Sequence, residues 1–291
     1  MIAHGPRERT LATADNLRLY FQDWGDPAWT ATPVLCLHGL VRNSRDFAPL
    51  ARWLSDPAAA KPRRVVVPDL RGRGRSARDP NWKNYNARNY VEDIRHLLGT
   101  LGIHRVIAIG ISMGGLLSIG MATAMPATLA ALVVDDAGPE IGRAGSGRIL
   151  KYIASDRPQP DWTTAANEMR KLLPTLSLRT EEEWLDFARA TFAEGSDGRL
   201  HFDWDTNIAR PLRAEMAGET ANLWNLWRAV GNRPALVIRG GVSDILSAET
   251  LLRMQAEKPD LVHFTLPGVG HAPTLNEPPV REVLHDFLRP L

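Results

Sequence analysis

One serine lies in a sequence pattern that is typical of a catalytic nucleophile. Residues 110–114 read GISMG and match G-x-S-x-G, in which the serine sits on a sharp turn between a strand and a helix. An apolar, β-rich run precedes the pattern at 105–109, and a run that favours a helix follows at 115–124. Glycines are needed because the tight turn leaves no room for side chains beside the serine. We therefore predict that Ser112 is a nucleophile.

A serine nucleophile needs a base and an acid, which in this pattern follow it in the order serine, acid, histidine. His271 lies in a glycine-containing loop just past the last predicted strand, 262–266. That edge of an open α/β sheet is where sites form. His263 lies inside the strand and His285 on the last predicted helix, where structural or solvent-exposed histidines are expected. His271 is therefore predicted to be the general base.

The acid and the oxyanion donors should lie at the same edge of the sheet. Asp244 follows predicted strand 235–238 through the turn GGVS, and we predict that it orients His271. Asp136, at the C-terminal end of predicted strand 129–134, is the alternative. Two N–H groups must hold the oxyanion. Met113, after the nucleophile, and Leu40, in the loop after predicted strand 34–37, are the expected donors.

The elements that position these residues divide the chain into two parts of one core and an insertion. Strand and helix patterns alternate over 1–138 and again over 232–291, which predicts a parallel sheet with helices on both faces. Residues 139–231 are instead helical and aromatic, and we interpret them as a cap over the site. Trp162, Trp184 and Trp204 are its candidate substrate contacts, although aromatic residues at helical spacing are often core residues.

Several short strings, in the order in which they occur, resemble those of the α/β-hydrolase superfamily, close to its capped esterase and C–C-bond hydrolase branches. The strings are LCLHGL, PDLRGRGRS, GISMGG, RGGVSD and PGVGHAPTLNEP. The resemblance implies an eight-stranded, mostly parallel sheet with an inserted helical cap, the triad Ser112, Asp244 and His271, and an oxyanion hole at Leu40 and Met113. Related haloalkane dehalogenases and epoxide hydrolases carry aspartate at the nucleophile position, and the serine argues against both.

The resemblance implies an acyl hydrolase that needs no metal or organic cofactor. A small-to-medium carboxylic ester or lactone is the expected substrate, with preference for short acyl chains. Hydrolysis of a C–C bond in a β- or vinylogous diketone is the first alternative, although Ala272 stands where hydrolases of that type carry tryptophan. A ligand-binding receptor on the same scaffold is the second alternative.

The composition narrows the range of partners. The chain has 291 residues, 44% of them hydrophobic and 23% charged, and a net charge of only +2, so nothing indicates a nucleic-acid or membrane partner. GRGRSA at 72–77 fits a dinucleotide-binding fingerprint but does not begin a helix. Cys36 is the single cysteine, which excludes an intrachain disulfide. The first ten residues lack the apolar segment of a signal peptide. We expect a cytoplasmic protein that acts on a small molecule.

Overall fold

An eight-stranded sheet forms the centre of the protein. The computed structural model describes residues 5–217 and 222–291. The strands are β1 (Arg7–Ala12), β2 (Arg18–Trp24), β3 (Val34–Leu37), β4 (Val65–Pro68), β5 (Val106–Ile111), β6 (Leu129–Asp135), β9 (Ala235–Gly240) and β10 (Val262–Leu266). Their order is β1-β2-β4-β3-β5-β6-β9-β10, and β2 pairs antiparallel with both β1 and β4 whereas the other pairs are parallel. The predicted fold class is confirmed.

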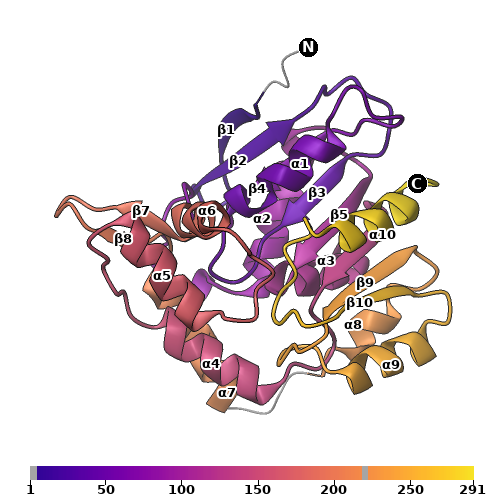
Figure 1. Cartoon of the computed structure of the whole chain (residues 1–291). Coiled ribbons are helices and arrows are strands. Elements are labelled where there is room, and N and C mark those ends of the chain that lie inside the picture. The colour runs from indigo at the N-terminus through magenta and orange to yellow at the C-terminus, as the bar shows by residue number, and fades with distance from the viewer. Residues whose placement is uncertain (1–4, 218–221) are drawn as a thin grey trace.

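Helices cover both faces of the sheet, as Figure 1 shows. Along β5, Val106 and Ala108 point into one core, whereas Ile107 and Ile109 point into the other. This alternation follows from the two-residue repeat of a strand and explains why β5 is apolar throughout. The first core is covered by α2 (Ala87–Thr100), α3 (Met113–Ala124), α8 (Trp224–Arg228) and α9 (Ala248–Glu257), and the second by α1 (Ala48–Leu54) and α10 (Pro278–Leu288).

A mainly helical segment separates β6 from β9. It contains α4 (Arg143–Ile153), α5 (Trp162–Leu172), α6 (Glu181–Thr191), the hairpin of β7 (Phe192–Glu194) and β8 (Leu200–Phe202), and α7 (Ala209–Ala217). Figure 1 shows these elements grouped together on one side of the molecule, away from α10. Helix α6 begins with a capping box, because the Thr180 hydroxyl accepts from the Glu183 N–H while the Glu183 carboxylate accepts from the Thr180 N–H.

The end of this segment lies close to the core. Helix α8 packs beside α3, and its Trp227 indole donates a hydrogen bond to the Met254 carbonyl on α9 at 3.2 Å. The predicted cap boundaries, 139 and 231, therefore enclose one helix that covers the sheet, while residues 218–221 lie outside the described residues.

Short 3₁₀ helices occur at Ser44–Phe47, Trp82–Asn84 and Thr206–Ile208. Among the helices that the structure describes, none is long and apolar enough to cross a membrane.

Candidate active site

Ser112 stands on a sharp turn between β5 and α3. Its backbone has φ +54° and ψ −118°, a conformation that non-glycine residues rarely adopt. A side chain at Gly114 would collide with the Leu37 carbonyl of the neighbouring strand, and one at Gly110 would collide with Gly114 itself. These close backbone approaches explain why the turn requires glycine on both sides of the serine. The surrounding structure holds the Ser112 side chain in place beyond the end of β5.

A continuous chain of hydrogen bonds leads from Ser112 through His271 to a buried carboxylate. The Ser112 hydroxyl donates to His271 Nε2 at 2.8 Å, and His271 Nδ1 donates to Asp136 Oδ2 at 2.7 Å. The side chain of Asp136 is completely buried and that of His271 is 10% exposed. A carboxylate only accepts hydrogen bonds, so the proton of a neutral His271 lies on Nδ1, and Nε2 is free to accept the serine proton.

The carboxylate that contacts His271 is that of Asp136, whereas the sequence predicted Asp244 as the acid. Asp136 follows β6 directly, and its φ of +50° turns the carboxylate toward the end of β9. There the Gly240 N–H donates to Oδ1 at 2.9 Å and the Ser243 hydroxyl donates to Oδ2 at 2.5 Å. The turn after β9 therefore supports the carboxylate of the neighbouring strand, and it does not itself supply the acid.

Asp244 forms an ion pair on the other side of that turn. Both of its carboxylate oxygens accept from the Arg148 guanidinium of α4, at 2.9 and 2.7 Å. The two side chains are 39% and 41% exposed, respectively. The hydrogen bonds and charge of Arg148 hold the pKa of Asp244 below its usual range. Asp244 is thus held at the junction of the cap segment and the core, and the structure does not bring it into contact with His271.

The two expected oxyanion donors lie on either side of the nucleophile. Met113 is the first residue of α3, so its N–H has no acceptor within the helix. Leu40 belongs to the loop after β3 and lines the same cavity as Ser112 and His271. In that loop the Gly39 backbone comes so close that an added Cβ would lie 3.8 Å from the Ser112 Cβ. These placements are compatible with the prediction that the N–H groups of Leu40 and Met113 hold the oxyanion.

Two buried side chains brace this loop. His38 donates from Nδ1 to the Gly39 carbonyl at 2.7 Å and accepts at Nε2 from the Leu70 N–H at 3.0 Å. Burial lowers the pKa of His38 to about 4, which keeps the ring neutral in this structural role. Arg73, 1% exposed, donates from Nε to the Leu40 carbonyl at 2.8 Å. Arg73 lies in the run RGRGR, where the repeated arginines and glycines do not distinguish it from Arg71 and Arg75.

Comparisons with known proteins agree with this geometry. The family model described as "Alpha/beta hydrolase family" matches residues 34–284. The chain belongs to the alpha/beta hydrolase family. It is 33% identical over 271 residues to the 3-hydroxybutyrate-oligomer hydrolase of Cupriavidus necator, which covers 90% of this chain and 89% of that protein. It is 27% identical over 247 residues to the 2-(acetamidomethylene)succinate hydrolase of Mesorhizobium japonicum, with 82% and 81% covered.

A solved structure is similar over the whole length of this hydrolase. The crystal structure of an alpha/beta hydrolase from Novosphingobium aromaticivorans superposes with a TM-score of 0.90 at 39% identity and covers 100% of both chains. The predicted resemblance to the alpha/beta hydrolases is therefore confirmed. The protein is a hydrolase, and the identity of its substrate is a separate question.

The tryptophans predicted to contact substrate do not line the cavity of the hydrolase. Trp204 stacks on Phe202 with ring centres 4.0 Å apart, and Trp184 packs edge-on against Phe187 at 6.1 Å. Trp162 packs, partly buried, against the same hydrophobic core. Trp162 lies on α5 and Trp184 on α6, whereas Trp204 follows β8, and the packing of all three against hydrophobic neighbours agrees with the alternative interpretation.

The cavity that contains Ser112 and His271, which we call the catalytic cavity, has a volume of about 390 Å³ and is lined by other residues. Besides Leu40, Ser112 and His271, it is lined by apolar residues from the cap segment: Ile149, Tyr152, Leu173, Leu176, Leu178 and Phe187. Sequence reasoning missed the three leucines because they lie between α5 and α6, outside any helical repeat. Charged side chains at its margin include Arg148, Glu183 and Asp186. In the part of the chain that the structure describes, no cluster of three histidine, cysteine or acidic residues could hold a metal ion.

A second aspartate is buried directly behind the nucleophile. The Asp135 carbonyl accepts a hydrogen bond from the Ser112 N–H at 2.8 Å. Among the described residues, neither oxygen of the Asp135 carboxyl group has a hydrogen-bond partner. Burial first, and then the neighbouring Asp136, raises the pKa of Asp135 well above its usual range. Asp135 therefore keeps its proton to a higher pH in the folded protein than in the unfolded chain.

Proposed function

We propose that this hydrolase cleaves a small-to-medium carboxylic ester or lactone through an acyl-enzyme on Ser112. The observation that carries the proposal is the hydrogen-bonded chain from the Ser112 hydroxyl through His271 to Asp136. It joins a nucleophile, a base and an orienting acid in the arrangement that acyl transfer requires. The name of the relative from Cupriavidus necator, a hydrolase of 3-hydroxybutyrate oligomers, supports an ester as the substrate.

The proposed reaction begins when Ser112 Oγ attacks the acyl carbon and His271 Nε2 takes its proton. Asp136 accepts from Nδ1, so it keeps the ring in the correct tautomer and stabilises the imidazolium. Asp136 is completely buried, and this attraction is therefore only weakly screened by water. The N–H groups of Leu40 and Met113 hold the oxyanion, the imidazolium protonates the leaving alcohol, and water then attacks the acyl-enzyme.

The test is covalent labelling followed by substitution. A fluorophosphonate should modify the protein at Ser112, and Ser112→Ala should lose on the order of 10⁶ in the turnover of 4-nitrophenyl butyrate. Ser118→Ala is the matched control, because Ser118 lies on the same helix and its hydroxyl donates only to the Gly114 carbonyl. The control should retain full labelling and activity.

Other outcomes would redirect the assignment. Labelling at a different serine, or activity that survives Ser112→Ala, would refute the proposal. Cleavage of a vinylogous diketone faster than any ester would move the function to C–C bond hydrolysis by the same side chains. Labelling at Ser112 without turnover of any ester, lactone or diketone would favour a ligand receptor.

A further inference from the structure

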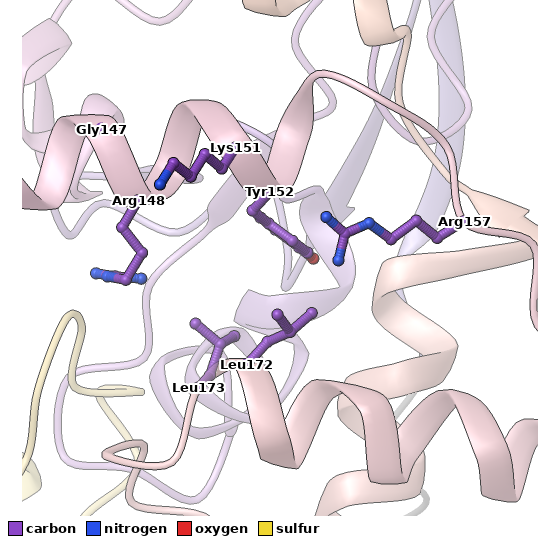
Figure 2. Close-up of a pocket in the computed structure, with 7 residues that line it drawn as sticks. All are labelled: Gly147, Arg148, Lys151, Tyr152, Arg157, Leu172 and Leu173. Atoms are coloured by element: carbon purple, nitrogen blue, oxygen red, sulfur yellow. The ribbon is translucent and has the colours of Figure 1, made fainter.

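A second cavity adjoins the catalytic one and is rich in cationic side chains. It has a volume of about 480 Å³ and is lined by Gly147, Arg148, Lys151, Tyr152, Arg157, Leu172 and Leu173. Figure 2 shows Arg148, Lys151 and Tyr152 on α4, with the Arg157 guanidinium pointing toward the Tyr152 hydroxyl. The two leucines close the opposite side from the end of α5. We call this cavity the basic pocket.

The basic pocket and the catalytic cavity have common walls. Arg148, Tyr152 and Leu173 line both, and the catalytic cavity also contains Ser112 and His271. Because the two cavities share these walls, the proposal places the far end of a molecule bound at Ser112 in the basic pocket. The apolar leucine walls suit a short hydrocarbon spacer between the reacting ester and whatever group the pocket binds.

The charge in the basic pocket is positive and largely uncompensated. Of the lining residues that the structure describes, three are cations and none is an acid. Arg148 is paired with Asp244, but within residues 5–217 and 222–291 neither Lys151 nor Arg157 forms an ion pair. The carboxylate of the neighbouring Asp156 contacts the His201 ring at 2.6 Å and accepts from the Phe202 N–H at 3.1 Å.

This excess is local, because the whole chain has a net charge of only +2. A concave site lined by one sign of charge raises the local concentration of ligands of the opposite sign.

We propose that the basic pocket binds a free carboxylate of the substrate, so that the preferred esters are those that end in a carboxylate. This inference rests on the proposed ester cleavage at Ser112. Guanidinium groups form paired hydrogen bonds with carboxylates, and an ammonium adds a point charge beside them. Oligomers of a hydroxy acid meet both requirements, since they contain internal esters and end in a carboxylate. The relative named a 3-hydroxybutyrate-oligomer hydrolase is consistent with this class.

The experiment compares two substrates that differ only in charge. The linear dimer of 3-hydroxybutyrate carries one ester bond and a free carboxylate, and its terminal carboxamide is a neutral analogue of nearly the same shape. The acid should be cleaved with a kcat/KM at least about tenfold higher than that of the amide, mainly through a lower KM. Raising the sodium chloride concentration to about 0.5 M should reduce this preference, because salt screens the exposed cations.

Substitutions assign the preference to the pocket. Lys151→Gln and Arg157→Gln should each raise KM for the acid about three- to tenfold and leave kcat and the amide unchanged. Lys171→Gln is the matched control, because Lys171 is an exposed lysine on α5 that does not line the cavity. This variant should behave as wild type with both substrates.

The failure of this inference can be told apart from the failure of the proposed function. Equal rates for acid and amide, or variants that affect both substrates alike, would overturn the basic pocket as a carboxylate site. Cleavage of 4-nitrophenyl butyrate but of neither dimer would also overturn it, while ester hydrolysis would stand. An absence of fluorophosphonate labelling at Ser112 would instead overturn the ester hydrolase itself.

Discussion

Replacement of Asp136 by asparagine should reverse the proton position on His271. Asp136 Oδ1 accepts from the Gly240 N–H, and Oδ2 accepts from Ser243 and from His271 Nδ1. In Asp136→Asn the amide oxygen must stay opposite Gly240, since an unpaired buried N–H costs about 1–3 kcal/mol. The amide NH₂ then faces Nδ1, which has to accept. The ring proton moves to Nε2, and His271 can no longer take the proton of Ser112.

The expected loss in kcat is about 10⁴, which corresponds to about 5 kcal/mol of transition-state stabilisation. The fold should be preserved, because the residue at 136 has φ +50° and asparagine tolerates this region nearly as well as aspartate. Asp244→Asn is the matched comparison. It breaks an ion pair whose two members are 41% and 39% exposed, so the interaction lost should be worth less than about 1 kcal/mol. Even if all of this energy entered the transition state, kcat would fall less than about fivefold.

The assay is hydrolysis of 4-nitrophenyl butyrate, with enzyme concentration taken from fluorophosphonate titration of the wild type and from absorbance for the variants. Ser112→Ala prepared in parallel supplies the background from contaminating esterases, which could mask a loss of this size. Thermal unfolding checks that both variants fold. A large loss for Asp244→Asn beside a small one for Asp136→Asn would refute the argument and assign the acid to the turn after β9.

Three other features lead to measurable expectations. A cavity of about 390 Å³ should favour short acyl chains, and each methylene that does not fit should cost about 1–3 kcal/mol in kcat/KM. A maximum at palmitate in a 4-nitrophenyl ester series would contradict this. Arg73→Met removes the bond to the Leu40 carbonyl and should lower kcat about tenfold or more with little change in KM. An equal loss in kcat for Arg75→Met, which replaces an exposed arginine, would show that the effect of Arg73→Met is nonspecific. The pKa of Asp135 is raised in the folded protein, so the protein takes up a proton on folding at pH values between the unfolded and folded pKa of this group. In that range the contribution of Asp135 to the free energy of unfolding falls by about 1.4 kcal/mol per pH unit as the pH rises. Denaturant unfolding from pH 4 upward should show this slope in wild type and lose it in Asp135→Asn, whereas an unchanged slope would assign the linkage to another group.

The structure brings the predicted nucleophile and the predicted base into hydrogen-bond contact, and the sequence signal of each is local. The tight turn at Ser112 needs glycine at 110 and 114 to avoid backbone collisions, and such a requirement is visible in five consecutive residues. The place of His271, just past the end of β10, follows from the order of strands and helices. The eight-stranded, mostly parallel sheet was implied by the family resemblance, and periodicity alone does not determine the order of its strands.

The acid was harder to predict because two aspartates lie at one sheet edge. Asp136 and Asp244 follow neighbouring strands, β6 and β9, and both chain positions are compatible with the edge. The choice depends on the positive φ at 136 and on a serine in the other turn that donates to that carboxylate. Neither feature has a distinctive sequence pattern, although a short polar residue directly after a buried strand is a usable signal for positive φ.

The cap segment shows what periodicity can and cannot reveal. Trp184 and Phe187 are three residues apart on α6, a spacing typical of one helix face, and their rings contact each other. Periodicity does not say whether a packed face meets the core of the segment or the substrate. The residues that line the cavity, Leu173, Leu176 and Leu178, come from the link between two helices. Their positions depend on how the segment lies over the sheet, which is a tertiary property.

The contact of His271 with Asp136, and not with Asp244, also has a consequence for the region where the substrate would bind. Asp136 already supports His271, so Asp244 is available to hold Arg148 with two hydrogen bonds. Arg148 is the cation that lines both cavities, and the pair keeps its guanidinium at the boundary between them. An arginine held there without a carboxylate would attract the free carboxylate of the substrate to the boundary and not into the basic pocket. Because Asp244 compensates that one charge, the uncompensated cations are Lys151 and Arg157, which line only the basic pocket. In the proposed reaction Asp136 thus supports His271, while Asp244 leaves the charge that would orient the substrate in the basic pocket.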